Sequence, residues 1–254
     1  MLVPRIIPVL LLENNRLVKT IKFQSPKYIG DPLNTVRIFN EKLVDELIVL
    51  NIDKESKDLN YDLISRLATE CRMPLCYGGG IDSLDKIKKI ISLGVEKISI
   101  CSNALANPNF IKEAIKLTGS QSIVVTLDLL LHDGEYKITT KSGSIKHDIK
   151  LFDYLEKLEQ INVGEILINF IDRDGTMQGY DLETIKLIAR SVTMPCTFLG
   201  GASSYKDISN LFKTCGNVGA AAGSLFVFNG PYKAVLISYP SRLDKTKILN
   251  YGYN

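Results

Sequence analysis

The chain has 254 residues, of which 45% are apolar, and a formal net charge of +3 at pH 7. Because its lysines are scattered rather than gathered in a stripe, this modest charge argues against a nucleic-acid partner. No apolar run approaches the roughly 18 residues of a membrane span and no signal peptide pattern opens the chain, so we expect a cytoplasmic protein with no membrane association.

Eight short apolar runs follow one another along the chain. Their nearly continuous apolar character is typical of parallel strands that are covered on both faces. The predicted strands are Ile6–Leu12, Leu47–Ile52, Leu75–Tyr77, Lys97–Cys101, Ile123–Leu127, Ile166–Ile171, Cys196–Leu199 and Val218–Ala221. Amphipathic segments with helical spacing separate them, and we expect Asp82 or Ser83 to cap the helix near residue 84 and Asp181 to cap the helix near residue 182.

Residues 45–104 and 164–225 are two imperfect copies of one module. Asp45-Glu46, Met73-Pro74 and Gly78-Gly79-Gly80 in the first copy correspond to Gly164-Glu165, Met194-Pro195 and Gly200-Gly201-Ala202 in the second. A repeat that holds strand, helix, strand and glycine-rich turn indicates a closed array of β/α units. At about 250 residues we predict one domain, residues 1–254, folded as a (β/α)8 barrel of two half-barrels. An open doubly wound sheet is the alternative, but it would leave the duplication unexplained.

The segment at about residues 132–146 breaks the alternation of strands and helices. Asp133-Gly134 and Ser142-Gly143-Ser144 flank the run Glu135–Thr140, a pattern that predicts a short β-hairpin after the fifth strand. It would lie on the catalytic rim of the barrel, where such an insert covers a substrate or contacts a partner.

Glycine-rich turns follow four of the predicted strands in matched pairs. Backbone N–H groups at such turns, together with helix N-termini, favour anions. Two matched cradles across one barrel mouth imply a small molecule that is phosphorylated at both ends. The predicted phosphate-binding residues are Gly79, Gly80, Ser102, Asp174, Gly175, Thr176, Gly200, Gly201, Gly223 and Ser224. The loop 172–176 also fits a simple Asx-type turn with solvated charges.

Asp128 follows the fifth strand and is the candidate general acid or base at the mouth. It could instead simply cap the following loop. The first strand offers no carboxylate at the corresponding end, where Leu11 stands. Acid–base chemistry across a barrel needs groups on both sides of the substrate, and one side presents leucine.

Four charged residues begin strands at the opposite face: Arg5, Glu46, Lys97 and Glu165. If they point into the barrel they are desolvated and must pair with one another. Two interpretations remain open, a plug that seals the floor and a polar gate through which a small molecule enters.

Metal and disulfide chemistry receive little support. The five cysteines lack CxxC spacing, and the two histidines, His132 and His147, both lie in the polar insert. We predict no disulfide framework, no metal site and no cofactor.

These residues resemble, nearly end to end, the cyclase subunit family of imidazole glycerol phosphate synthase, a (β/α)8 protein of histidine biosynthesis. The matching stretches include Arg5-Ile-Ile, Arg16-Leu-Val-Lys19, Gly30-Asp31-Pro32, Gly78-Gly79-Gly80-Ile81, Asp133-Gly134-Glu135 and Ile171-Asp-Arg-Asp-Gly-Thr176. The resemblance implies a lyase-type cyclase in a glutamine amidotransferase complex. A glutaminase subunit would dock on the barrel floor and release ammonia, which would travel through the barrel to a bis-phosphorylated ribosyl substrate. It assigns the four floor charges to an ammonia gate, and the family's loop lysine and catalytic aspartate to Lys19 and Asp128.

The departures from the family gather at the mouth. Its other catalytic aspartate falls at Leu11, a second aspartate becomes Asn51, and an asparagine becomes Cys101. Losing one member of an acid–base pair typically lowers the rate on the order of 10²–10⁴-fold. Glu13 is near in sequence, but we expect it to lie in the loop and to substitute poorly.

Three hypotheses follow. An intact inlet with damaged chemistry fits a paralogous branch associated with glycosyl amidation in surface-polysaccharide pathways, in which a third protein, a sugar-amidating synthetase, receives the ammonia. The second hypothesis is an active cyclase that recruits another acid. The third is a phosphosugar-binding barrel without an amidotransferase partner.

Overall fold

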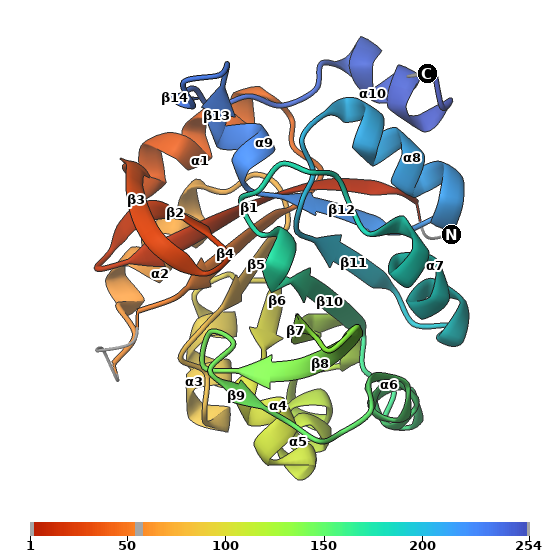
Figure 1. Ribbon diagram of the computed structural model, residues 1–254. Helices are drawn as coiled ribbons and strands as arrows, with labels where there is room; N and C mark the ends of the chain where they lie inside the picture. Colours follow the sequence, from red (N-terminus) through yellow and green to blue (C-terminus); the bar gives the residue numbers. More distant parts are fainter. Residues whose placement is uncertain (1–2, 54–57, 253–254) are drawn as a thin grey trace.

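A computed structural model describes residues 3–53 and 58–252 and places eight parallel strands in a closed barrel (Figure 1). Each barrel strand pairs with the next one along the chain, β7 pairs with β10, and β12 returns to pair with β1. This closure confirms the (β/α)8 prediction and rules out the open sheet. The barrel strands are β1 (Arg5–Glu13), β4 (Leu47–Asn51), β5 (Leu75–Gly78), β6 (Lys97–Ile100), β7 (Ile123–His132), β10 (Glu165–Phe170), β11 (Cys196–Leu199) and β12 (Gly219–Ala222).

Helices surround the barrel (Figure 1). Ser83 caps α3 and Asp181 caps α7, as predicted, each accepting a backbone N–H three residues on. The α-helices are α1 (Pro32–Glu41), α2 (Tyr61–Glu70), α3 (Leu84–Ser92), α4 (Ser102–Ala106), α5 (Pro108–Thr118), α6 (Leu151–Gln160), α7 (Leu182–Ser191), α8 (Tyr205–Cys215), α9 (Ser224–Val227) and α10 (Arg242–Leu249). The chain also forms two short 3-10 turns, η1 (Ser120–Ser122) and η2 (Ile171–Arg173), and a small hairpin of β13 (Phe228–Asn229) and β14 (Ala234–Val235).

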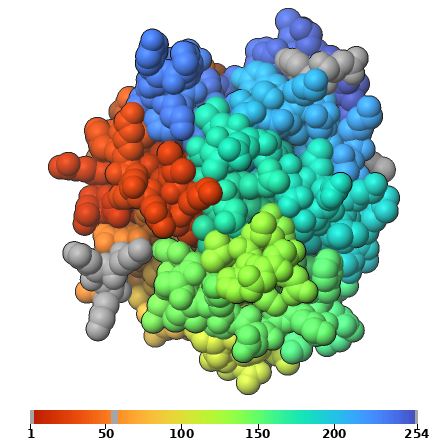
Figure 2. Space-filling model, in the orientation of Figure 1, coloured from red at the N-terminus to blue at the C-terminus, as the bar shows by residue number. Residues whose placement is uncertain are grey.

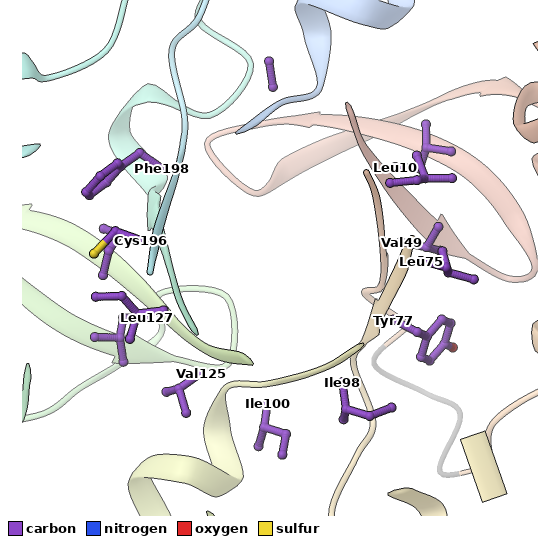
Figure 3. Close-up of a cluster of buried hydrophobic side chains, with 14 of the residues drawn as sticks. Leu10, Val49, Leu75, Tyr77, Ile98, Ile100, Val125, Leu127, Cys196 and Phe198 are labelled. Carbon is purple, nitrogen blue, oxygen red and sulfur yellow. The ribbon is translucent and has the colours of Figure 1, made fainter. Parts of the chain in front are cut away.

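The strand residues divide between two apolar cores because successive side chains point to opposite faces. The larger core lies between strands and helices, and Figure 3 shows its members, including Leu10, Val49 and Val125, around the outside of the strands. The smaller core fills the barrel and contains Val9, Leu11 and other alternate residues. Alternate residues along each strand therefore point into the barrel, and the residues between them point toward the helices.

The two sequence copies make matching contacts at the barrel floor. Leu47 donates its N–H to the carbonyl of Pro74 over 2.9 Å, and Ile166 donates to Pro195 over 2.9 Å. The C-terminal segment docks on the outside, where Ser209 Oγ donates to the carbonyl of Ile248 in α10. Among the residues described, no helix is long and apolar enough to cross a membrane.

Hairpins extend two of the barrel strands at the mouth. The predicted one is present: β7 continues into β8 (Glu135–Thr140), which pairs with β9 (Ile145–Lys146). A second, formed by β2 (Arg16–Ile21) and β3 (Gln24–Gly30), was not predicted. Figure 2 shows both hairpins on one face of the molecule, the first in green and the second in red.

Candidate functional site

The four floor charges form a closed ring of ion pairs inside the barrel. Arg5 bonds to Glu46 and, over 2.7 Å, to Glu165, while Lys97 Nζ lies 2.8 Å from an oxygen of each carboxylate. Thr197 Oγ1 completes the shell of Glu165 by donating to Oε1 over 2.5 Å. Arg5, Lys97 and Glu165 begin three strands and Glu46 directly precedes β4, and the four charges satisfy one another, as pairing requires in a desolvated place.

The two kinds of charge in the ring differ in their access to solvent. The side chains of Arg5 and Lys97 are 18% and 19% exposed, whereas those of Glu46 and Glu165 are 4% and 8% exposed. Burial alone would raise the pKa of Glu165, but the two cations outweigh it and the pKa is lowered. In the same way the carboxylates outweigh burial and raise the pKa of Lys97. Arg5, whose pKa is also raised, Lys97 and Glu165 therefore stay charged around neutral pH.

Above the ring, the barrel interior has a polar side and an apolar side. On β6 the inward residues are Lys97 and Ser99, and Cys101 follows directly after the strand. Ser99 Oγ lies 2.6 Å from Thr126 Oγ1 of β7. On β1 and β4 the inward residues are aliphatic, including Val9, Leu11 and Ile48. Lys97 and Cys101 are four residues apart, which is about 13 Å along an extended chain, so the ring and Cys101 lie at opposite ends of β6.

A cavity of about 820 Å³ opens at the mouth. Its floor includes the Ser99–Thr126 pair and Asp128, and the tips of both hairpins cover it, with Phe23 from one and Ser142 from the other. The insert at about 132–146 thus lies over the mouth, as the sequence predicted.

Asp128 is half-buried at the base of this cavity. Its Oδ1 accepts from Asn169 Nδ2 over 3.1 Å and its Oδ2 accepts from Cys101 Sγ over 3.6 Å. Burial raises the pKa of Asp128 to about 6, and the two donors limit the rise. Asp128 is therefore poised to gain or lose a proton near neutral pH, which suits a general acid or base.

The predicted phosphate cradles lie in two separate places. Gly79, Gly80 and Ser102 line the mouth cavity, whereas Gly200, Gly201, Gly223 and Ser224 line a small pocket beside Lys19. Gly79 takes a backbone conformation that favours glycine. Its φ is +94°, and a Cβ there would lie 1.9 Å from the carbonyl oxygen of Asn51. Its repeat equivalent Gly201, at a φ of +101°, would meet Gly179 in the same way.

Three predicted residues beside the second cradle are already engaged within the protein. Lys19 lies in strand β2 rather than in a loop, and its Nζ is 2.6 Å from Asp174 Oδ1. Asp174 also accepts from Thr20 Oγ1, so its carboxylate neutralises the lysine rather than facing an anion, which it would repel. Thr176 donates its hydroxyl to the carbonyl of Arg173 and lies outside the residues that line the pocket, whereas Gly175 lines it.

The substituted positions lie together at the mouth cavity. Leu11, Asn51 and Cys101 all line it, and Leu11 is 8% exposed on the strand diametrically opposite Asp128 in the eight-strand order. The expectation that Glu13 lies in the loop was wrong. It ends strand β1 on the inward-facing parity of Leu11 and lines the cavity, because β1 runs on to pair with β2.

Asn169, like Ser99 and Thr126, is a site residue that the sequence did not reveal. It is the last residue but one of β10 and is 4% exposed. A polar residue within an apolar strand was the only available signal. Across the described ranges, no group of three or more His, Cys, Asp or Glu side chains is arranged to hold a metal ion.

The closed barrel, with its functional groups at the carboxyl ends of the strands, places the chain among the (β/α)8 barrels that carry a site at that face. It belongs to the family described as histidine biosynthesis protein, whose model matches residues 5–232. Imidazole glycerol phosphate synthase subunit HisF of Lactococcus lactis subsp. cremoris is 35% identical over 259 residues, which cover 98% of this chain and 100% of the relative.

Closer similarity is found to proteins that carry the same subunit name provisionally. The Leptospira borgpetersenii protein is 53% identical over 249 residues, covering 96% of this chain and 98% of its own. A Vibrio vulnificus protein, provisionally named subunit hisF3, is 47% identical over 253 residues, covering 98% and 97%. The chain is thus a homologue of HisF-type cyclase subunits.

Proposed function

We propose that this chain is the ammonia-receiving barrel subunit of a glutamine amidotransferase complex and has little or no cyclase activity of its own. The observation that carries the proposal is the combination of a complete floor ring with Leu11 opposite Asp128. A leucine side chain neither donates nor accepts a proton, so the mouth lacks half of a cross-barrel acid–base pair.

The floor is the entrance in this proposal, and a glutaminase subunit is the partner that docks there. The two ring cations are the more exposed members, so the ring can be approached from the floor. Beyond the ring, Cys76, Val124 and Leu167 form an apolar layer, which favours neutral ammonia over a charged ion. The hydroxyl pair and Asp128 follow on the way to the mouth.

The acceptor of the nitrogen, we propose, is a separate sugar-amidating synthetase of surface-polysaccharide biosynthesis. Two facts support this role. Leu11 removes the group that the cyclization would need, and the close Vibrio vulnificus relative carries the numbered name hisF3, which fits a duplicated member of the family. The glycine-rich turns would then hold a phosphorylated ligand of the delivery complex.

The test of lost chemistry is to restore the acid. The purified chain would be assayed with the bis-phosphorylated histidine precursor and ammonium salt, alongside Leu11→Asp and the matched control Leu11→Asn. We expect wild-type turnover far below the usual 1–10³ s⁻¹ and a rise of about 10²-fold or more only in Leu11→Asp. Wild-type turnover in the usual range would refute the conduit role.

The test of the partnership uses the glutaminase encoded nearest to the gene. We expect the two proteins to co-purify and glutamine hydrolysis to rise on binding. The variant Glu46→Gln should keep the association while weakening the transfer of ammonia, measured as ammonia lost to bulk solvent. Absence of any association would favour a phosphosugar-binding barrel that works alone.

An active cyclase is the second candidate, and the position of Glu13 favours it. This carboxylate lines the mouth cavity on the same strand as Leu11 and so could supply the missing acid. If that is its role, Glu13→Gln should abolish cyclase turnover, whereas Glu13→Asp should retain part of it. Equal turnover in wild type and Glu13→Gln would eliminate this candidate.

A further inference from the structure

Asn169 holds a buried hydrogen-bond acceptor that the protein leaves unused. Its Nδ2 donates to Asp128 Oδ1 over 3.1 Å, while its Oδ1 meets no donor in the described residues. The residue is only 4% exposed and lines the mouth cavity. A buried acceptor without a partner costs about 1–3 kcal/mol, so its presence at a cavity wall indicates a ligand that brings a donor.

The orientation of the amide is set by Asp128. If Oδ1 faced the ionised carboxylate, two acceptors would oppose each other, so Nδ2 takes that place and Oδ1 is directed elsewhere. The result is a pair of acceptors, Asn169 Oδ1 and the Asp128 carboxylate, joined by one hydrogen bond. Leu11 on the opposite side of the cavity offers neither donor nor acceptor, so the pair gives the base of the cavity one polar side.

We propose that Asn169 Oδ1 and the Asp128 carboxylate form a receiving site for ammonia, held as the ammonium ion, at the point where the barrel interior opens into the mouth. Neutral ammonia takes the proton of the Asp128 carboxyl there, which leaves a carboxylate beside the ammonium ion, and return of that proton to Asp128 frees neutral ammonia for transfer. This inference rests on the proposed function, because it supplies the place where the conducted nitrogen pauses before transfer. Ammonium has four N–H donors and no acceptor, so two adjacent oxygens match it. The Ser99–Thr126 hydroxyls, which also line the cavity, lie beneath it on the side of the floor ring.

The groups that act on Asp128 come from every strand packed beside it. Asn169 of β10 and Cys101 beyond β6 donate to its oxygens, Thr139 of β8 donates to its backbone carbonyl, and the charge of Asp174 raises its pKa. A bound cation would lower that pKa, because it favours the ionised form. The pKa of Asp128 therefore reports whether a cation is bound beside it.

The experiment is a pH titration of Asp128 in the isolated chain labelled with ¹³C at aspartate carboxyl carbons, assigned with Asp128→Asn. It is run in ammonium chloride, and in potassium chloride at equal ionic strength. With ammonium at about ten times its dissociation constant, binding to the ionised form lowers the midpoint by about one pH unit. An equal response to potassium, or none to ammonium, overturns the proposal.

Two variants separate the orphan acceptor from the acidity of Asp128. Asn169→Leu and Cys101→Ala each remove a donor and so raise the pKa of Asp128. Only Asn169→Leu removes the free acceptor, so it should lose the ammonium response while Cys101→Ala keeps it. Loss of the response in both, or in neither, overturns the proposal.

The hydroxyl group of a sugar ligand could also donate a hydrogen bond to Asn169 Oδ1. A midpoint shift caused by ribose 5-phosphate and not by ammonium would overturn the ammonium site and assign the acceptor to a sugar. Because no glutaminase is present in this titration, its failure leaves the partnership test intact. Equally, a glutaminase that does not bind would leave the ammonium titration interpretable.

Discussion

Ionised Asp128 should destabilise the fold, and its removal should stabilise the protein in a pH-dependent way. The folded-state pKa is about 6, against an ordinary value of 3.8, because the carboxyl is buried. The folded state therefore keeps a proton that the unfolded state has released, and stability falls as the pH rises from about 4 to 6. Each pKa unit corresponds to about 1.4 kcal/mol. The rise from 3.8 to about 6 therefore means that ionised Asp128 lowers the free energy of unfolding by about 3 kcal/mol.

The variant Asp128→Asn removes this penalty, so its advantage over wild type should grow with pH. We expect the difference in the free energy of unfolding to rise by about 2 kcal/mol between about pH 4.5 and 8, most of it below about pH 6.5. Urea denaturation followed by circular dichroism measures it, since the chain has no tryptophan. A difference that stays flat or shrinks as the pH rises would refute the reasoning.

A matched control is another buried aspartate that has a cation beside it. Asp174 is paired with Lys19, so Asp174→Asn leaves a buried charge without its partner. Breaking such a pair costs about 3–5 kcal/mol. Near neutral pH, Asp128→Asn should therefore raise the free energy of unfolding and Asp174→Asn should lower it. The comparison shows that the gain at Asp128 comes from removing an unpaired buried charge and not from replacing an aspartate by asparagine as such.

Three further outcomes are expected. Glu165→Gln should lower the free energy of unfolding by about 3–5 kcal/mol; because the pKa of Glu165 is lowered by the ring cations, the stability it contributes is present above its unfolded pKa, and urea midpoints of wild type and variant should converge in acid. Gly201→Ala should be far more destabilising than Gly216→Ala, since only at Gly201 would a Cβ strike backbone, 2.1 Å from a carbonyl oxygen; similar urea midpoints would contradict this. Burial and the Asp128 charge raise the pKa of Cys101, so iodoacetamide should alkylate it slowly at pH 8 and faster in Asp128→Asn, as peptide mass spectrometry would show; an unchanged rate would count against the pair.

The barrel could be predicted because its signals are local. Each strand is a short apolar run, and the duplicated module repeats the order of strand, helix and turn. The predicted ends fell within a few residues of the observed ones, with the largest difference at β7, which runs on to His132 as one arm of the hairpin. The hairpin of β2 and β3 escaped because residues 24–28 are exposed and carry little apolar periodicity.

The mouth was predicted in part. Asp128, Leu11 and the glycine turns could be placed at the carboxyl ends of strands from the order of elements alone. The sequence could not show which of these side chains are free and which are bonded to another residue, because that depends on their neighbours across the barrel. Lys19 and Asp174 are 155 residues apart in sequence and 2.6 Å apart in space.

The sequence by itself determined the eight strands and the residues that begin and end them, because apolar runs and turn residues act over a few positions of the chain. It also supplied the four floor charges and the leucine at position 11. Only the tertiary structure decided that the charges close into one ring, that Glu13 lines the mouth and that Asn169 keeps an unused acceptor. These depend on the register between strands that are distant in sequence, which is fixed only when the barrel closes.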